Sequence, residues 1–340
     1  MKGNSGQLFF AWTAFQRRQV SMAVLCGFEN LFFPVRRSQG RFAKVLTYIK
    51  HSWKMMYTLR ARRPKVVWVQ LPQVPVLWVA LIYRRLFSND AIIIADCHNA
   101  MFRPPWSKVP LGVSMLSKCD IIIAHNVDVM RTAVELGVDK TRVMVVEDPP
   151  ASFLNGAEHS IDLECKRPWF VFPASFAADE PIAELLMAAS ATPDVSVLIT
   201  GNTRNCRDQN LIREAPANVR FLGFLERVRF ESLLQNCDAV IAFTRLEGVQ
   251  LSVCGEAVGA ERPMLVSDTM TLRRQFPEGT VFVDSTDSNS IAEGIKRMTV
   301  EHLRLAAEMK DFHARLRDEW VQVKAKGIAD RIASIEMLKK

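Results

Sequence analysis

Residues 238–267 read DAVIAFTRLEGVQLSVCGEAVGAERPMLVS. The stretch begins and ends with short apolar runs, and a helical pattern lies between them. Two apolar strands joined through a helix are typical of a parallel sheet. One carboxylate, Glu247, stands where the first strand ends, and another, Glu256, stands inside an apolar helix that we expect to begin near Val249. Because a buried carboxylate requires a partner, the stretch predicts a site as well as a fold.

The same alternation of strands and helices extends along the chain in both directions. The expected strands are residues 7–12, 30–35, 65–71, 91–96, 120–125 and 142–147, then 169–174, 196–200, 219–223, 238–243, 263–267 and 280–284. Helical patterns lie between them, for example at 40–62 and 127–137. Continuous apolar strands between helices indicate parallel sheets covered on both faces. The predicted fold is therefore α/β, with two tandem doubly wound Rossmann-like domains facing across a cleft.

The periodicity stops between residues 147 and 168, where two prolines and a polar stretch indicate a domain linker. We expect an N-terminal domain at 1–150, a C-terminal domain at 151–315, and a final helix at 316–340 that packs back on the first domain.

Composition restricts the compartment. The seven cysteines are scattered and form no C-x-x-C pair, which argues against a disulfide framework and a zinc site and favours a reducing, cytosolic compartment. Arg17 and Arg18 directly follow the first apolar run, a pattern that does not resemble a signal peptide. The longest apolar run, residues 74–83, is about half the length that a bilayer requires. We expect a protein that is soluble or lies on a membrane surface.

No Asp or Glu occurs from Asn30 to Asn89, although basic residues are frequent there. They are Arg36, Arg37, Arg41, Lys44, Lys50, Lys54, Arg60, Arg62, Arg63, Lys65, Arg84 and Arg85. Residues 36–65 therefore predict contact with an anionic membrane surface, since each basic residue near such a surface adds about 1 kcal/mol of attraction. The alternative is a solvated helix face. No helix-turn-helix, zinc-finger or RNA-binding signature supports nucleic acid as a partner.

In doubly wound folds the ligand binds at the carboxyl ends of the strands. The residues expected there in the first domain are Asp96, His98, Asn99 and His125. In the second domain they are Gly201, Asn202, Gly223, Phe224, Thr244, Arg245, Glu247 and Gly248.

Glu247 and Gly248 precede a helix whose free N–H groups would suit a phosphate. Glycine at position 248 lets the backbone approach a ligand closely. Glu256 lies farther into that helix, where its carboxylate could accept two sugar hydroxyls. The alternative for Glu256 is an ion pair with Arg262.

Residues 247–268 resemble the signature of retaining GT-B glycosyltransferases of the family 4 type, which have two glutamates followed by Ala, a small residue and Pro before a strand. The resemblance implies that Glu247 contacts the donor sugar and that Glu256 holds the nucleotide ribose. It makes the second domain the donor domain and the basic first domain the acceptor side. Eight residues separate the glutamates here, whereas seven are usual; a subset of bacterial polysaccharide enzymes resembles this sequence in the longer spacing and in a segment like Gly223-Phe224-Leu225.

By this resemblance His98 and Glu247 are the catalytic candidates, with His98 bonded to the donor sugar. The donor-binding candidates are Gly201, Asn202, Arg204, Gly223, Phe224, Arg245, Gly248, Val249, Gln250, Leu251 and Glu256. Asn202 has the alternative of a plain turn residue and His98 that of a core histidine. Asp96 either orients His98 or caps the next segment.

One departure concerns the donor diphosphate. The family carries Arg and Lys after the first strand of the donor domain, whereas residues 175–181 read SFAADEP and contain no base. The positive charge must then come from Arg204, Arg245, or Arg17 or Arg18. The candidates on the acceptor or diphosphate side are Arg17, Arg18, Asn99 and His125, the last contacting either the acceptor or the loop.

The resemblance implies sugar transfer from a nucleotide sugar to a lipid-linked or oligosaccharide acceptor, with retention, in capsule or exopolysaccharide assembly. No cofactor is expected beyond the nucleotide-sugar co-substrate, and no metal, since the sequence has no Asp-x-Asp motif. The expected location is the cytoplasm, at the inner face of the plasma membrane.

Three alternatives remain open. A nucleotide-sugar epimerase of the same fold would turn over the donor without an acceptor. An NAD-dependent oxidoreductase is disfavoured because no G-x-G-x-x-G follows the first strand of either half. A non-catalytic GT-B-like binding subunit is favoured by the missing bases at 175–181.

Overall fold

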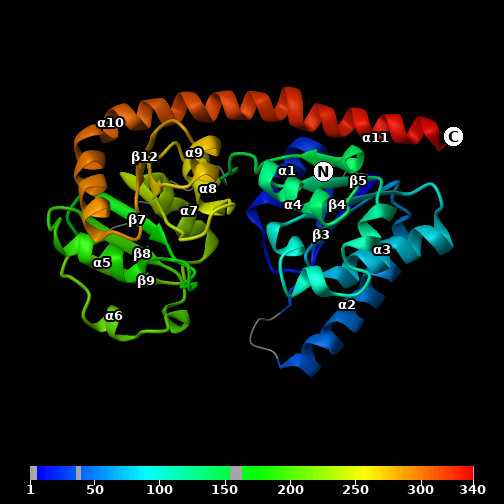
Figure 1. The fold of residues 1–340 in the computed structure, drawn as a ribbon, viewed down its shortest axis with the longest axis horizontal. Coiled ribbons are helices and arrows are strands. Elements are labelled where there is room, and N and C mark those ends of the chain that lie inside the picture. The colour runs from blue at the N-terminus through cyan, green and yellow to red at the C-terminus, as the bar shows by residue number, and fades with distance from the viewer. Residues whose placement is uncertain (1–5, 36–39, 154–162, 340) are drawn as a thin grey trace. The chain divides into compact units, whose positions relative to one another are not determined.

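A computed structural model describes residues 6–35, 40–153 and 163–339. The chain divides into two compact units (Figure 1). Unit 1 contains residues 1–149 and 319–340, and unit 2 contains residues 150–318. The sequence placed these boundaries at 150 and 315. The centre of the expected linker, residues 154–162, and the basic residues Arg36 and Arg37 lie outside the described residues.

Unit 1 is built on a sheet of six strands that are all parallel. The strands are β1 (Gln7–Ala11), β2 (Glu29–Phe32), β3 (Val66–Leu71), β4 (Ile92–Cys97), β5 (Ile121–Ala124) and β6 (Val143–Val145). Their order is β2-β1-β3-β4-β5-β6. The chain thus turns from one side of the sheet to the other between β1 and β3, and such a topological switch point is where ligands bind in open α/β sheets.

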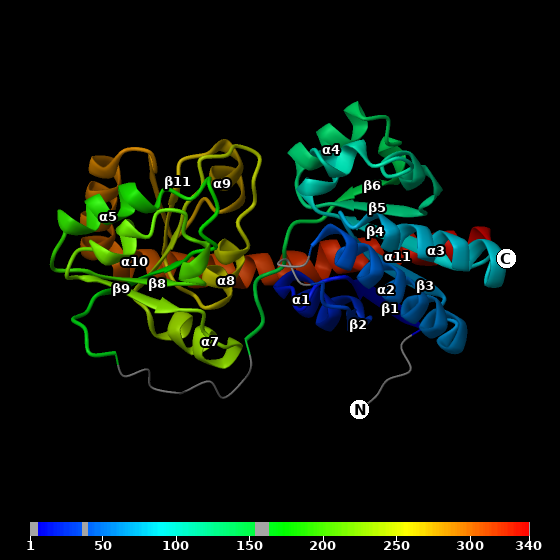
Figure 2. The ribbon, with the colours of Figure 1, turned by 90° about the horizontal axis from the view of Figure 1, so that it is seen from below.

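Helices cover both faces of this sheet because side chains of successive strand residues point to opposite faces. One face packs on α2 (Arg41–Arg62), α3 (Val74–Phe87) and α4 (Val127–Glu135). The other packs on α1 (Arg17–Cys26) and α11 (Lys326–Leu338). In Figure 2, α2 and α3 run beside one another. The apolar character of residues 66–71 and 92–97 follows from this two-sided burial.

Unit 2 repeats the architecture with a second parallel sheet in the order β12-β11-β10-β7-β8-β9. The strands are β7 (Trp169–Pro173), β8 (Ser196–Thr200), β9 (Val219–Gly223), β10 (Ala239–Ala242), β11 (Met264–Ser267) and β12 (Thr280–Val283). The switch point lies between β7 and β10, which are neighbours in the sheet.

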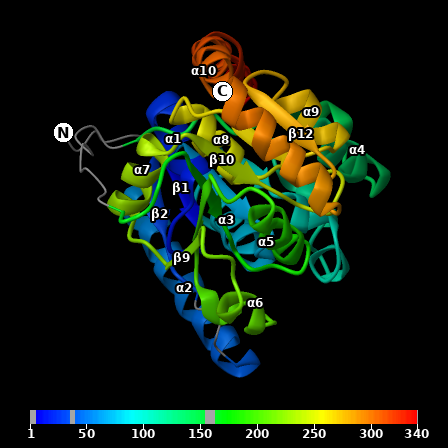
Figure 3. The same cartoon turned by 90° about the vertical axis from the view of Figure 1, so that its left-hand side faces the viewer.

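The helices of unit 2 divide between the two faces of its sheet. One face packs on α5 (Ile182–Ser190) and the first part of α10 (Ser288–Glu319). The other packs on α7 (Arg227–Asn236), α8 (Ser252–Gly259), α9 (Met270–Gln275) and the later part of α10. Figure 3 shows α5 and α7 on opposite sides of the strands, with the short helix α6 (Asn210–Arg213) beyond the end of the sheet.

The expected strands are all present, and both sheets are parallel, so the predicted α/β fold is confirmed. The helix expected from about Val249 begins instead at Ser252. Residues 249–251 belong to no helix or strand, and Leu251 is extended at the helix start, with φ −90° and ψ 120°. The apolar pattern extends upstream of the helix because these residues are partly buried without being helical.

Beyond α10, residues Trp320–Ala325 form a π-helical segment that leads into α11. In unit 1, Trp320, Ile328 and Ile332 are buried in the same cluster as Phe9 and Trp68. The last segment of the chain is therefore part of the core of unit 1. Within the described residues no helix combines the length and apolar character needed to cross a membrane.

Candidate functional site

The switch point of unit 2 brings together the loops that follow β7 and β10. The Thr244 hydroxyl donates to the Asp179 carboxylate at 2.7 Å, and the Arg245 N–H donates to the Asp179 carbonyl at 2.9 Å. The backbone of Thr244 is fixed as well, since its N–H donates to the hydroxyl of Ser267, at the end of β11, at 2.9 Å. The chain leading to Glu247 therefore leaves β10 in a defined direction.

Glu247 is exposed, yet its carboxylate is fixed by backbone donors. It accepts from the N–H groups of Met270 at 3.1 Å, Thr271 at 3.0 Å and Gly248 at 3.2 Å. Partial burial opposes ionisation, but these N–H groups outweigh it and lower the pKa of Glu247 below its usual value. Near neutral pH the group is a carboxylate that accepts hydrogen bonds, so it has no proton to give as a general acid.

Gly201, at the end of β8, allows two strand ends to approach closely. Its φ is +114°, and a Cβ there would lie 1.9 Å from the Ala174 carbonyl oxygen. Its N–H donates to the Gly223 carbonyl at 2.9 Å. The residues predicted at the ends of β8 and β9 thus lie together beside the loop after β7.

Asn202, Arg204 and Phe224 occupy the rim of this region. The Asn202 side chain accepts from the Arg204 N–H at 3.2 Å, so Asn202 caps a short turn as its alternative reading proposed. The Arg204 guanidinium is exposed and makes no ion pair to any residue in the described part of the chain. Phe224 is 81% exposed directly after β9, where an aromatic ring is available to stack on a planar ligand.

The loop after β7 is where the glycosyltransferases that the sequence resembles carry Arg and Lys. Here its backbone N–H groups bind the carboxylate of Glu180, in the same loop. The N–H groups of Ser175 and Phe176 donate to the Glu180 carboxylate at 3.1 and 2.8 Å, and the Ser175 hydroxyl donates at 2.6 Å. Phe176 adopts φ +59° to aim its N–H there. The sequence showed that Arg and Lys are absent from residues 175–181. It did not show that Glu180 would accept hydrogen bonds from the N–H groups of this loop.

Arg245 and Glu256 lie on either side of Glu247 in sequence. Arg245 forms an ion pair with Glu184 on α5. This pair neutralises part of the positive charge that was expected to bind the donor diphosphate. Glu256 is half-buried on α8, beyond Gly248 and the irregular residues 249–251. Arg262, proposed as an alternative partner of Glu256, donates from Nη2 to the Gln235 carbonyl at 2.5 Å.

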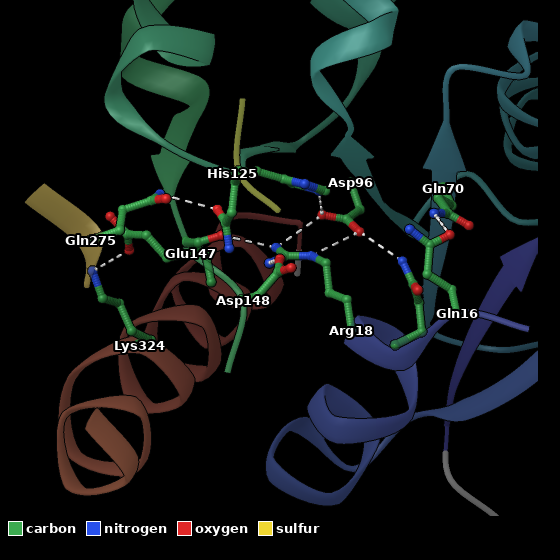
Figure 4. Close-up of polar contacts among 12 residues, drawn as sticks. Gln16, Arg18, Gln70, Asp96, His125, Glu147, Asp148, Gln275 and Lys324 are labelled. Atoms are coloured by element: carbon green, nitrogen blue, oxygen red, sulfur yellow. Dashed lines mark hydrogen bonds and ion pairs between the residues drawn. The ribbon is translucent and has the colours of Figure 1, made fainter. Parts of the chain in front are cut away.

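In unit 1 a buried charge cluster lies at the strand ends (Figure 4). Asp96 is fully buried and accepts from Arg18 Nη2 at 3.1 Å, Gln19 Nε2 at 3.1 Å and His125 Nε2 at 3.1 Å. Burial by itself would raise the pKa of Asp96, but Arg18 and His125 together lower it well below its usual range. Asp96 is therefore ionised across the physiological pH range.

Arg18 has a structural role that the sequence did not predict. It is 3% exposed, and Nη1 donates to Asp148 at 2.6 Å while Nη2 donates to the Val146 carbonyl at 2.9 Å. A guanidinium bound by two carboxylates has little charge left for a diphosphate, so the prediction for Arg18 is not supported by this geometry. Arg17 is also buried, with its guanidinium 5.4 Å from the centre of the Phe15 ring.

His98 is half-buried at the end of β4 and is the more accessible of the two histidines. Its ring lies edge-on to His125, with centroids 5.3 Å apart. Burial, and then the neighbouring His125, lower the pKa of His98 to about 4, so it is neutral at physiological pH. Nδ1 accepts from the Ala100 N–H at 3.4 Å, which leaves Nε2 as the protonated nitrogen and a donor.

Asp96 was expected either to orient His98 or to cap the following segment, and it does neither. In the described structure its partners are Arg18, Gln19 and His125, and His98 itself caps the 3₁₀ turn of residues Asn99–Phe102. Asn99 begins that turn and is half-buried. The structure thus brings His98, His125, Asp96 and Arg18 together in unit 1. In unit 2 it brings Gly201 and Gly223 together and places Thr244 and Arg245 against Asp179. Among the described residues no group of three or more His, Cys, Asp or Glu side chains is arranged to hold a metal ion.

Comparisons with known proteins agree with this description. Residues 159–312 match the family model described as glycosyl transferases group 1. No curated protein matches the sequence significantly. Among solved structures, HepE from Anabaena in complex with UDP-glucose is 13% identical with a TM-score of 0.69, covering 96% of this chain and 99% of its own.

Two further structures are similar over nearly their whole length. Sucrose-phosphate synthase from Thermosynechococcus elongatus is 12% identical with a TM-score of 0.73, covering 96% of this chain and 99% of its own. A glycosyltransferase from Rickettsia africae is 12% identical with a TM-score of 0.65, covering 98% and 99%. The chain therefore has the two-domain α/β fold of GT-B proteins, and its second unit is similar to the group 1 glycosyl transferases.

Proposed function

We propose that this protein is a retaining glycosyltransferase that transfers a sugar from a nucleotide-sugar donor, bound at the strand ends of unit 2, to a lipid-linked saccharide. The observation that carries the proposal is the match of residues 159–312 to the group 1 glycosyl transferases. That region contains Gly201, Glu247 and Glu256, and the first two lie at the strand ends where an α/β sheet binds its ligand. HepE, which shares the fold, was solved with UDP-glucose.

The residues of unit 2 suit the separate parts of a nucleotide sugar. The Glu247 carboxylate is ionised and held by three N–H groups, so it can accept hydroxyls of the donor sugar without moving. Glu256 would hold the ribose. Gly201 lets the backbone meet the diphosphate, and Arg204 supplies an unpaired positive charge.

Transfer requires stabilisation of the leaving diphosphate while the sugar develops oxocarbenium character. In this proposal Arg204 and the N–H groups at the start of α8 provide it, because Arg18 and Arg245 are held in ion pairs. His98, neutral and with Nε2–H available, would donate a hydrogen bond to the donor sugar. No protein nucleophile is invoked.

The acceptor side rests on the surface of α2, which supports membrane docking. Residues Phe42, Leu46, Ile49, Trp53 and Tyr57 follow helical spacing along one face and are 50–78% exposed. Met55 and Leu59 on another face of the same helix are fully buried in the core of unit 1. Exposed apolar residues interspersed with Lys50, Lys54 and Arg60 are typical of a helix that lies in the interface of an anionic membrane. A lipid-linked acceptor of capsule or exopolysaccharide assembly would be reached from there.

Donor binding is tested by thermal shift with a panel of nucleotides and nucleotide sugars. We expect one base to stabilise the wild type and to lose that effect in Glu256→Ala. The matched control is Glu214→Ala, an exposed glutamate elsewhere in unit 2, which should respond as the wild type does. Absence of any shift across the panel would contradict the proposal and favour a non-catalytic binding subunit.

Reaction type is tested by incubating the stabilising nucleotide sugar with and without lipid-linked saccharides extracted from membranes. Product nucleotide should appear only with the acceptor, and the new glycosidic bond should keep the donor's anomeric configuration. Isomerisation of the donor sugar in the absence of acceptor would instead identify an epimerase.

Membrane docking is tested by co-sedimentation with vesicles of phosphatidylglycerol and phosphatidylcholine. We expect binding that weakens with salt and is lost in Ile49→Asp/Trp53→Asp. Leu303→Asp, which alters an equally exposed leucine on α10 of unit 2, is the matched control. Binding that survives the α2 substitutions would refute this face as the docking surface.

A further inference from the structure

An apolar groove lies in unit 1 between α3 and the connection from β4 to β5. Its cavity has a volume of about 510 Å³ and is lined mainly by Trp78, Ile82, Arg85, Leu86, Leu111 and Met115. Arg85 is the only charged residue among those that line it. The groove is distinct from the exposed face of α2 and from the strand-end residues, and the function proposed above does not use it.

The wall on α3 is a helix face that the fold leaves uncovered. Trp78, Ile82, Arg85 and Leu86 follow one another at helical spacing. Ile82 and Leu86 are 48% and 66% exposed, whereas Leu77 and Ala80 on the other side of the helix are fully buried. Contiguous exposed apolar side chains of this kind indicate a surface that binds another apolar molecule.

The opposite wall of the groove contains Leu111, whose backbone conformation is unfavourable for a residue with a Cβ. Leu111 has φ +58°, a backbone region that residues with a Cβ disfavour, and its side chain is 63% exposed. Trp78 Nε1 donates to the Leu111 carbonyl at 3.4 Å and ties the loop to α3. Burial therefore does not explain this conformation, and the exposed side chain remains available to an apolar ligand.

Arg85 adds an unneutralised positive charge to the groove. The preceding residue, Arg84, pairs with Asp120 at 2.8 Å. Arg85 is exposed and, within the residues that the structure describes, makes no ion pair or hydrogen bond through its guanidinium. The nearest stretch of sequence carries no acid from Asn30 to Asn89.

We propose that this groove binds one acyl chain of an anionic phospholipid, with the lipid phosphate paired to Arg85. A hydrocarbon chain needs no hydrogen bonds and therefore suits this predominantly apolar lining. The unpaired guanidinium selects an anionic head group. The inference rests on the proposed docking of unit 1 to a membrane and deepens it by assigning a specific lipid site.

The connection that forms one wall of the groove begins at His98 and ends before β5. A chain seated against Leu111 and Met115 would steady this connection. Lipid binding would then be linked to the position of the catalytic candidate at its start, through a continuous segment of backbone.

The test uses the full chain and dodecyl phosphate below its micelle concentration, with binding measured by titration calorimetry. Dodecyl maltoside, which has the same chain without the charge, should bind about tenfold more weakly because it lacks the charge-assisted contact. Inorganic phosphate should show no binding. Equal affinity for the two amphiphiles would overturn the assignment of the phosphate to Arg85.

Three variants examine the groove directly. Leu86→Asp and Arg85→Glu should each weaken dodecyl phosphate binding at least about tenfold, since each removes one of the two contacts. Leu111→Gly should weaken it as well while leaving the thermal midpoint equal or higher, because glycine accepts the positive φ. Leu303→Asp and Arg317→Glu on α10 are the matched controls and should bind as the wild type does.

The variants also separate this site from the α2 face. Ile49→Asp/Trp53→Asp should retain dodecyl phosphate binding even where vesicle binding is lost. Unchanged binding in the groove variants would overturn the inference and leave the α2 proposal intact. A wild-type dimer that Leu86→Asp dissociates in sedimentation velocity would show that a second copy covers the groove, which would also overturn it.

Discussion

The two units use the same switch-point geometry in opposite ways. In unit 1 the polar groups at the strand ends satisfy one another: Asp96 is fully buried, and Arg18 lies between it and Asp148. In unit 2 the corresponding groups face solvent: Glu247 is exposed, and its carboxylate is held by backbone N–H groups rather than by a cation.

This difference indicates where a ligand can bind without first breaking the protein's own contacts. A buried carboxylate with several partners loses much if one partner is displaced. A carboxylate held by backbone donors at the surface can meet a ligand without the loss of a buried ion pair. Unit 1 therefore has a rigid polar cluster with His98 at its edge, while unit 2 has exposed polar groups to which a ligand could bind without breaking a buried ion pair.

The largest effect should come from breaking the buried cluster of unit 1. Asp96→Ala leaves the buried Arg18 without one of its carboxylates, and we expect a loss of about 3–5 kcal/mol in the free energy of unfolding. Asp268→Ala, which breaks the exposed pair with Arg273, should cost less than about 1 kcal/mol. Both are measured by urea unfolding. Equal losses would mean that burial does not distinguish the two ion pairs.

Gly201 tests the close approach of strand ends in unit 2. Gly201→Ala should cost more than about 2 kcal/mol, because the new Cβ meets the Ala174 carbonyl and the backbone is already at positive φ. Gly137 has φ +88° but open space around it, so Gly137→Ala should cost only about 1 kcal/mol. The difference in thermal midpoint isolates the steric part. Its absence would show that the loop after β7 moves away easily.

Glu247 should behave in the opposite way to Asp96. Glu247→Gln should reduce stability by at most about 1 kcal/mol, as loss of a helix-capping acceptor does. Its effect on kcat/KM for the nucleotide sugar should be about a hundredfold or more, because an ionised acceptor is lost where charge develops. Stability is measured by thermal unfolding and turnover by release of nucleotide. A stability loss well above about 1 kcal/mol together with normal turnover would assign Glu247 a purely structural role.

The last prediction concerns the pH dependence of stability that His98 confers, which is spread over about 2.5 pH units. Its pKa in the folded protein is about 4, below the ordinary value of about 6.5 that applies in the unfolded chain. Between these values the unfolded chain binds more protons, so stability falls as pH decreases from about 6.5 toward 4, by less than about 1.4 kcal/mol per pH unit. His98→Gln should flatten the dependence of the thermal midpoint in this window.

The strands and their parallel arrangement could be predicted from the sequence because each is a continuous apolar run between helices. The position of α8 was predicted less well, since the partly buried residues 249–251 share the helix's apolar pattern without its backbone. The local pattern of apolar residues indicates which residues are buried more directly than it indicates whether they are helical.

The partners of the site residues could be predicted far less well. Arg18 and Asp96 are distant in sequence, and nothing in the local pattern of either indicates that they meet. In the same way, the sequence showed that residues 175–181 contain no base, but it did not show that Glu180 accepts hydrogen bonds there. The donors are backbone N–H groups, which no side-chain motif indicates. Pairing across strand ends depends on sheet order, which the sequence alone left open.

The return of the chain to unit 1 has a consequence for biosynthesis. Trp320, Ile328 and Ile332 cover one face of the unit 1 sheet, yet a ribosome makes them only after the whole of unit 2. At about 5–20 residues per second, the part of that face that α11 covers stays exposed for roughly 10–30 s of translation, although α1, which covers the rest, is made early. Unit 2 can therefore complete its fold before unit 1 does, and the nascent N-terminal sheet is the part of the protein most in need of a chaperone.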